Sequence, residues 1–144
     1  MTIGKLAAVS VIRDRTLAIT WDDGHTGIVD VSASIDRVSA LEPLGDPAVF
    51  AQASVSHDGW SVEWPGGLDF GTGQLRRWAD EQAGDTMRAA AFRDWMDRHN
   101  LTLDSAAGAL GLSRRIIAYY LSGEHPIPKT VMLATEGFDH RKAA

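Results

Sequence analysis

Alternating apolar and polar residues open the chain and predict an antiparallel sheet. The alternation covers three stretches, each about the length of one strand: residues 6–13, 15–21 and 26–31. An Asp-Gly step at Asp23-Gly24 separates the last two stretches. Such a step is typical of a tight hairpin because both residue types tolerate positive φ values. The sequence therefore predicts three antiparallel strands at its start.

The next stretch mixes short helical and strand signals. Asp46 before Pro47 is typical of a helix start, with the aspartate as N-cap and the proline in the first turn. A second Asp-Gly step, at residues 58–59, indicates another hairpin. Alternation over residues 60–64 then predicts a half-buried strand that carries two tryptophans. We expect a small antiparallel sheet of roughly five strands, covered by one or two helices.

A break in the pattern at residues 83–85 divides the chain. The pattern predicts a helix over residues 74–82, before the break. After the break, apolar residues recur mainly at helical spacing. The sequence therefore predicts an α+β protein with two domains. Residues 1–84 form the small antiparallel-sheet domain, and residues 85–144 form an all-α domain.

Apolar spacing predicts four helices in the second domain. The first is a helix over residues 86–100, in which Phe92, Trp95, Met96 and His99 recur at i, i+3, i+4 and i+7. Two short helices, over residues 103–110 and 114–121, come next. The last helix begins at Pro128, with an apolar face at Ile127, Val131, Ala134 and Phe138.

The turn between the two short helices carries the most specific signal. Gly111 can adopt the left-handed conformation that ends a helix. Ser113 can cap the following helix by accepting a backbone N–H bond. Ala107 is small at the point where two closely crossing helices need a small side chain. This spacing is that of a DNA-binding helix-turn-helix.

Composition narrows the class of protein. The 144 residues include 44% apolar and 23% charged residues, as in an ordinary globular protein. The sequence contains no cysteine, which excludes disulfides, thiolate catalysis and cysteine-based zinc sites. The early apolar run at residues 6–12 is too short to span a bilayer. We therefore expect a cytoplasmic protein that does not bind membranes.

Charge is divided unevenly between the two predicted domains. The net charge of −5 argues against a protein that coats nucleic acid nonspecifically. Residues 1–84 hold 6 Lys+Arg and 12 Asp+Glu, a net charge of −6, whereas residues 85–144 hold 8 and 7, a net charge of +1. The difference favours two domains with different roles.

Residues from about Phe92 to Phe138 resemble the phage-repressor and Cro-type (lambda-repressor-like) helix-turn-helix family. The shared features are a long helix, Leu101-Thr102, Ala107, Leu110-Gly111-Leu112-Ser113, Ile117, Ser122-Gly123 and a helix that begins at a proline. A sheet domain with a Trp64-Pro-Gly-Gly67 segment ahead of them is also similar to small bacterial proteins of unknown function. The resemblance implies a lambda-repressor-like fold for residues 85–144.

The resemblance also implies a DNA-binding surface on the helix at residues 113–122, which would enter the major groove. The residues implied to face the bases are Arg114, Arg115, Ile116, Ala118 and Tyr119. Those implied to touch phosphates are Ser122, Lys129 and Thr102. Arginine suits base recognition because its planar fork can donate two hydrogen bonds to one guanine. Leu103 stands where such repressors often carry glutamine, and it removes one polar contact to DNA.

We therefore expect a sequence-specific transcriptional regulator that binds double-stranded DNA. Specific sites usually contain two half-sites about one helical turn apart, which predicts a homodimer. The acidic first domain would then serve dimerisation or partner binding.

Other functions are open at this point. The acidic charge of the first domain is compatible with an antitoxin or adaptor that binds a protein partner. A tryptophan-rich sheet could instead sense a small molecule. We expect no enzyme, because no nucleophile–base pair or carboxylate dyad is recognisable. We expect neither metal nor cofactor, because His25 beside Asp22-Asp23 has no second ligand cluster and suits a polar hairpin tip.

Overall fold

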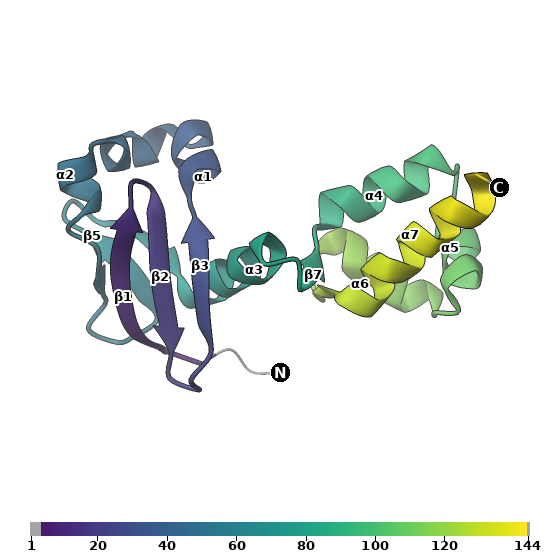
Figure 1. The fold of residues 1–144 in the computed structure, drawn as a ribbon, viewed down its shortest axis with the longest axis horizontal. Coiled ribbons are helices and arrows are strands. Elements are labelled where there is room, and N and C mark those ends of the chain that lie inside the picture. The colour runs from purple at the N-terminus through teal and green to yellow at the C-terminus, as the bar shows by residue number, and fades with distance from the viewer. Residues whose placement is uncertain (1–3, 144) are drawn as a thin grey trace. The chain divides into compact units, whose positions relative to one another are not determined.

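The computed structural model of the protein describes residues 4–143. The chain divides into two compact units, Met1–Ala83 and Gly84–Ala144, here called unit 1 and unit 2. Figure 1 shows both, coloured from purple to yellow along the chain. Over the described residues, each unit has its own hydrophobic core, and no residue belongs to both cores.

The first sheet of unit 1 is antiparallel, with its strands in the order β1-β2-β3 (Figure 1). The strands are β1 (Leu6–Arg13), β2 (Thr16–Trp21) and β3 (Thr26–Asp30). Each boundary lies within one residue of the prediction. Gly24 has φ +89° in the turn between β2 and β3, as the Asp-Gly step predicts.

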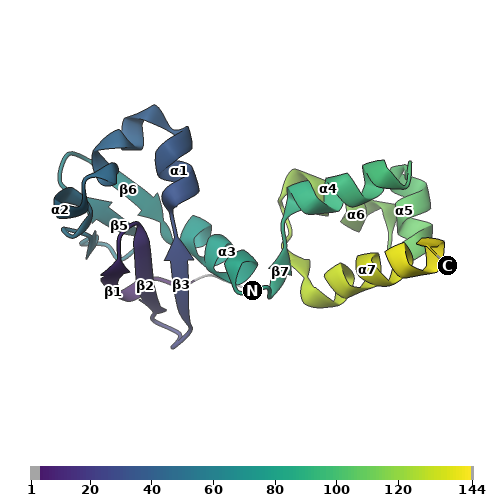
Figure 2. The ribbon, with the colours of Figure 1, turned by 45° about the horizontal axis from the view of Figure 1, so that its top comes forward.

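A second three-stranded sheet corrects the prediction of one sheet with roughly five strands. It contains β4 (Ser54–Val55), β5 (Ser61–Trp64) and β6 (Leu68–Gly71) in that order. Figure 2 shows β5 and β6 behind the first sheet. The missed strand is β6, which pairs with β5 through a turn where Gly66 and Gly67 have φ +93° and +81°. Two glycines with positive φ turn the chain back on itself, and this signal could have revealed the strand.

The helix predicted over residues 74–82 is confirmed as α3 (Thr72–Gln82), and three short helices precede it where one or two were expected. They are α1 (Ser32–Arg37), a 3-10 helix η1 (Ser39–Gly45) and α2 (Pro47–Phe50). The Asp46 side chain caps α2 by accepting a bond from Ala48 N at 2.9 Å, as predicted. The segment from α1 to η1 lacks an extended apolar period because each helix is at most seven residues long. Such short helices depend on packing rather than on propensity.

Tryptophans contribute to the core of unit 1 as expected, with one exception. Trp21 and Trp64 are buried, and their indole N–H groups donate to Thr72 Oγ1 at 2.7 Å and to the Phe50 carbonyl at 2.9 Å. Buried indoles usually find such partners. Trp60 instead lies in the turn before β5 and is 45% exposed, so the predicted strand begins one residue later.

Unit 2 is largely helical, but the prediction of an all-α domain is wrong. A short antiparallel ladder joins the start of the unit to the segment before its last helix, pairing Thr86 with Pro128 and Met87 with Ile127. The elements are β7 (Thr86–Met87), α4 (Ala89–Arg98), α5 (Leu103–Leu110), α6 (Arg114–Ser122), β8 (Ile127–Pro128) and α7 (Lys129–Ala143). The helix predicted over residues 86–100 is therefore shorter, and Pro128 lies in a strand rather than in a helix. Two-residue strands leave no periodic trace in a sequence.

The four helices of unit 2 surround one aromatic core. Phe92, Trp95 and Ile117 are at most 1% exposed, and Ala106 is fully buried where α5 meets its neighbours. On α7 the buried positions are Val131 and Thr135, whereas the predicted core residue Ala134 is exposed. No helix among residues 4–143 is both long enough and apolar enough to cross a membrane.

Candidate nucleic-acid interface

The turn between α5 and α6 is held at both ends by local interactions. Gly111 adopts the left-handed conformation at the C-cap of α5, with φ +69° and ψ +31°. Ser113 then caps α6, because its Oγ accepts a bond from Ile116 N at 3.2 Å. Both roles were predicted from residue type. The result is a rigid three-residue turn that sets the direction in which α6 begins.

One face of α6 packs into unit 2 and the other is open to solvent. Ile117 and Tyr120 are buried, and burial raises the pKa of the Tyr120 hydroxyl. Ile116 is half-buried and packs against the same core, so only part of this predicted base contact is accessible. The exposed positions of the predicted surface on α6 are Arg114, Arg115, Ala118 and Ser122.

Arg115, Tyr119 and His125 form a contact cluster on this surface. Arg115 Nε donates a hydrogen bond to Tyr119 Oη at 2.7 Å, and its guanidinium carbon lies 5.3 Å from the centre of the tyrosine ring. The ring centres of Tyr119 and His125 are 4.6 Å apart. His125 was not predicted to belong to the site. Its proximity arises because Gly123, with φ +81°, turns the chain back toward α6.

Arg114 has a different partner. Its Nη1 lies 3.6 Å from Asp104 Oδ2, and both side chains are largely exposed. The pair links the start of α6 to the first turn of α5. An exposed ion pair of this kind contributes little to stability. The carboxylate nevertheless offsets part of the positive charge at the N-terminus of α6.

The residues predicted to touch phosphates are distributed over three elements. Thr102 is the N-cap of α5 and shares reciprocal hydrogen bonds with Ser105 of 3.1 and 2.8 Å. Ser122 Oγ donates to the Tyr119 carbonyl at 3.1 Å, at the end of α6. Lys129 begins α7 and is exposed. Within the described part of the chain, no hydrogen bond or ion pair joins Lys129 to the α6 cluster.

Leu103 has a clear structural role at the position where the resemblance implied glutamine. It is half-buried and packs against the core of unit 2. This residue therefore belongs to the core contacts of α5, and its side chain offers no polar group to the surface.

The N-terminus of α6 favours an anion. Unsatisfied backbone N–H groups and the helix dipole make the first turn of a helix electropositive. Two adjacent arginines in that turn add to the positive potential, and no acidic residue lies in it. This arrangement is unfavourable for the isolated helix, and a bound anion such as a phosphate would stabilise it.

A second carboxylate cluster of unit 2 lies away from the α6 surface. Asp139 on α7 contacts His99 Nε2 at 2.5 Å and Arg98 Nη2 at 3.1 Å. The hydrogen bond with His99, assisted by the arginine, holds the pKa of Asp139 below its usual value. Since this group joins α7 to the end of α4, it has a structural role.

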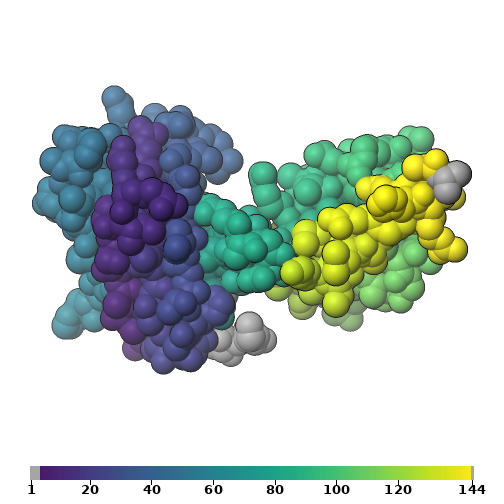
Figure 3. Space-filling view, viewed as in Figure 1, coloured from purple at the N-terminus to yellow at the C-terminus, as the bar shows by residue number. Residues whose placement is uncertain are grey.

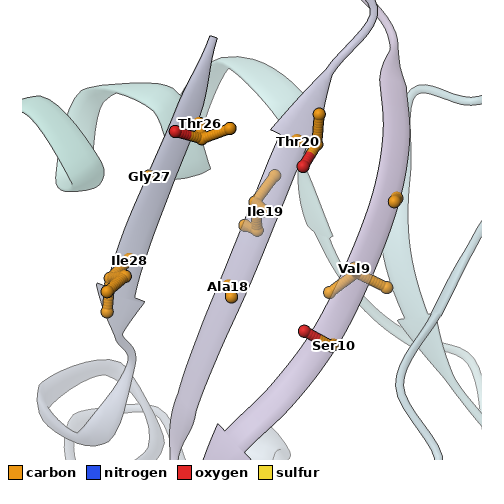
Figure 4. A pocket seen from close by; sticks show the side chains of 9 residues that line it. Val9, Ser10, Ala18, Ile19, Thr20, Thr26, Gly27 and Ile28 are labelled. Carbon is orange, nitrogen blue, oxygen red and sulfur yellow. The ribbon is translucent and has the colours of Figure 1, made fainter. Parts of the chain in front are cut away.

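Unit 1 presents a shallow depression on the outer face of its first sheet. Figure 3 shows this face, with the purple strand β1 and the blue strand β3 on the surface. The depression has a volume of about 470 Å³, and its lining combines small residues and threonines with the larger apolar residues Val9, Ile19 and Ile28 (Figure 4). No tryptophan lines it, in contrast to the predicted aromatic sensor pocket.

The hairpin tip that carries His25 is an ion-pair cluster. His25 Nε2 lies 3.5 Å from Asp80, and Arg76 lies 3.6 Å from Asp23 and 3.8 Å from Asp80. Among residues 4–143, no group of three or more His, Asp or Glu side chains has an arrangement that could hold a metal ion. The cluster ties the β2–β3 turn to α3.

Comparison with known proteins places the chain in a family. The class defined by the fold is a mixed α/β protein with small antiparallel sheets and several helices. Residues 6–81, more than half of the 144, match the family described as protein of unknown function (DUF2442). The chain therefore belongs to the DUF2442 family. The match lies in unit 1 and does not include α5 or α6.

One solved structure is similar over nearly the whole chain. It is described as a putative DNA binding protein, NE0471, from Nitrosomonas europaea ATCC 19718. The two chains are 38% identical, the similarity covers 96% of this chain and 90% of the other, and the TM-score is 0.57. The comparison with curated proteins finds no match.

Proposed function

We propose that the protein is a sequence-specific DNA-binding transcriptional regulator. In this proposal α5 and α6 form a lambda-repressor-like helix-turn-helix, and α6 enters the major groove. The observation that carries it is the pair Arg114 and Arg115, exposed in the first turn of a helix whose entry is held by Ser113 and Gly111. The description of the Nitrosomonas protein as a putative DNA binding protein supports the same function.

The exposed face of α6 supplies the base contacts in this proposal. Arg114 and Arg115 lie at the end of the helix that reaches deepest into the groove. Ala118 and the accessible part of Ile116 can meet thymine methyl groups. Tyr119 lies one turn beyond Arg115 on the same face.

Phosphate contacts flank this face. Thr102, Ser122 and Lys129 are exposed and carry hydroxyl or ammonium donors. Such contacts set the orientation of a protein on the duplex without reading its sequence. Thr102 also caps α5, so its substitution affects both folding and binding.

A homodimer completes the proposal. One helix reads only a few base pairs, and two copies would read two half-sites roughly 34 Å apart. The acidic unit 1 is the proposed dimerisation module, because its negative charge disfavours contact with phosphates. Sedimentation at micromolar concentration with and without duplex DNA would measure the number of copies.

Selection from random duplex DNA tests the function. We expect the full chain to enrich a defined, two-fold symmetric sequence, and its affinity to fall with salt as phosphate contacts release counterions. A steep salt dependence with no enriched sequence would contradict sequence-specific binding.

A protein partner for unit 1 is a second proposal, as for an antitoxin or adaptor. The observation that favours it is the net charge of −6 over residues 1–84 together with the open outer face of the first sheet. Co-purification from the native host would recover a basic partner in a fixed ratio. Recovery of the chain alone would contradict this second proposal without affecting the first.

A further inference from the structure

The two arginines of α6 differ in how their guanidinium groups are occupied. Arg114 uses a terminal nitrogen, Nη1, to face Asp104 at 3.6 Å. Arg115 instead uses its inner nitrogen, Nε, to donate to Tyr119 Oη at 2.7 Å. Within residues 4–143, the structure gives the two terminal nitrogens of Arg115 no hydrogen bond or ion pair. They are therefore available to a ligand as a pair.

Tyr119 is held in place by more than this hydrogen bond. The residue lies four positions after Arg115, the spacing at which side chains on one helix face meet. Its ring contacts the Arg115 guanidinium at 5.3 Å and the His125 imidazole at 4.6 Å. The backbone N–H of His125 also bonds to the Tyr119 carbonyl at 3.4 Å. The two ring contacts restrict the rotamers of Tyr119, and its hydrogen bond with Arg115 Nε then restricts those of Arg115, while the backbone bond holds His125 beside the ring.

This geometry matches one mode of base recognition. Arginine reads guanine by donating two parallel hydrogen bonds to O6 and N7. When Nε is engaged within the protein, only the end of the fork, formed by the two terminal nitrogens, can make this contact. Ordering the side chain before binding also lowers the entropy lost on binding.

We propose that Tyr119 is a positioning residue, which presets Arg115 to read one guanine with its two terminal nitrogens. The inference rests on the proposed function and goes beyond it by assigning the recognition of guanine to Arg115 rather than to Arg114. In this arrangement the Tyr119 hydroxyl acts through Arg115 and touches no base. Asp104 competes for Arg114, which leaves Arg114 to support affinity.

The test compares base preference among variants of the full chain. Duplexes derived from the selected sequence carry one substituted base pair each, and the ratio of dissociation constants is measured at every position. For the wild type, we expect one G·C pair to show discrimination on the order of 5- to 150-fold, the range for a two-bond arginine–guanine contact. Arg115→Ala should abolish discrimination at that pair alone.

Tyr119→Phe is the decisive variant, because it keeps the ring and its contacts but removes the hydroxyl acceptor. We expect its discrimination at the same pair to fall by about 2- to 12-fold, the cost of ordering one side chain on binding, while the ratios at other positions stay unchanged. The double variant Arg115→Ala/Tyr119→Phe should match Arg115→Ala. Circular dichroism and melting curves verify that each variant is folded, and Arg37→Ala in unit 1 controls for the loss of one positive charge.

Two results for variants at Tyr119 would overturn the inference and leave the proposed function intact. One is full discrimination in Tyr119→Phe when Arg115→Ala has lost it. The other is a double variant that loses more than Arg115→Ala, since Tyr119 would then contact DNA itself. The assignment to Arg115 also fails, with the proposed function intact, if Arg115→Ala changes no ratio while Arg114→Ala does. A wild type that enriches no sequence refutes both the inference and the proposed function.

Discussion

Unit 1 and unit 2 differ in architecture, in charge and in what each contributes to the assignment of family and function. Unit 1 is built on two small sheets, and residues 1–84 have a net charge of −6, whereas unit 2 is largely helical and residues 85–144 have a net charge of +1. The family match lies in unit 1, and the proposed DNA-binding surface lies in unit 2. Membership of the DUF2442 family and the proposed function therefore depend on different residues.

The largest expected effect on stability comes from truncating one buried phenylalanine in the core of either unit. Phe50 in unit 1 and Phe92 in unit 2 are both fully buried. Replacing either with alanine should lower the free energy of unfolding by about 3–5 kcal/mol, because the substitution removes buried apolar surface and leaves a cavity. Hydrogen exchange followed along the chain would show accelerated exchange only in the unit that carries the substitution.

The same experiment can contradict the view that the two units unfold independently. If Phe50→Ala accelerates exchange equally in unit 2, the two cores belong to one cooperative unit. The distinction drawn between the units would then not extend to their stability.

The next effect is on DNA affinity. Arg114→Ala and Arg115→Ala should each weaken binding to the selected duplex by roughly 1–3 kcal/mol, because each removes a donor from the start of α6. Arg37→Ala removes the same charge from an exposed site in unit 1 and should leave the dissociation constant unchanged. Fluorescence anisotropy with labelled duplex measures all three. Equal losses from Arg37→Ala and Arg115→Ala would indicate that charge alone, wherever it lies, drives binding.

A smaller effect is expected from removing helix caps. Thr102 caps α5 with a reciprocal pair of bonds, whereas Asp46 caps the four-residue α2 with one. Loss of an N-cap typically costs about 1 kcal/mol. Thr102→Ala should therefore destabilise unit 2 more than Asp46→Ala destabilises unit 1. Urea unfolding, monitored by hydrogen exchange at individual residues, measures both effects. The reverse order would show that the second bond of the Thr102 cap adds nothing.

The smallest expected effect is a loss of stability of unit 1 at acidic pH. In unit 1, hydrogen bonds from Ser56 and Trp60 lower the pKa of Asp58, and those from Ser32 lower the pKa of Asp30. A carboxylate with a lowered pKa stabilises the fold above its unfolded pKa and loses this contribution as the pH falls through the folded value. We therefore expect the stability of unit 1 to decline below about pH 4.

Asp58→Asn should flatten this decline. The matched control is Asp69→Asn, since Asp69 is exposed and its side chain forms no hydrogen bond with the described residues. Unfolding followed between pH 3 and 6 measures both variants. An unchanged acid profile in Asp58→Asn would show that these hydrogen bonds do not affect stability.

Features of the fold that depend on a few neighbouring residues could be predicted from the sequence. Gly111 and Ser113 define the ends of α5 and α6, and Asp46 defines the start of α2. Each acts through backbone groups within four residues of itself. The three strands of the first sheet were also predicted, because their alternation is regular and their turn is short.

Features that depend on distant residues could not be predicted. The β7–β8 ladder joins Thr86 to Pro128, forty-two positions apart, and each strand has two residues. The division of six strands into two sheets likewise depends on tertiary pairing. On α7, the buried face includes Thr135 rather than Ala134, because the face that packs inward depends on how the helix lies against α4 and α5.

The candidate site was predicted as a set of residue types on one helix face, without their contacts. Arg115 and Tyr119 were both among the predicted residues, but their hydrogen bond depends on side-chain rotamers. His125 was missed because it reaches Tyr119 only through the turn at Gly123. The Asp104 contact to Arg114 was also missed, since it spans two helices.

The central claim is that α6 of unit 2 is the surface that meets DNA. Amide chemical-shift changes in the full chain, recorded by NMR during titration with the selected duplex, test it most directly. We predict the largest changes over residues 113–125, with smaller ones near Thr102 and Lys129. Changes concentrated in residues 6–81, with α6 unaffected, would contradict the claim.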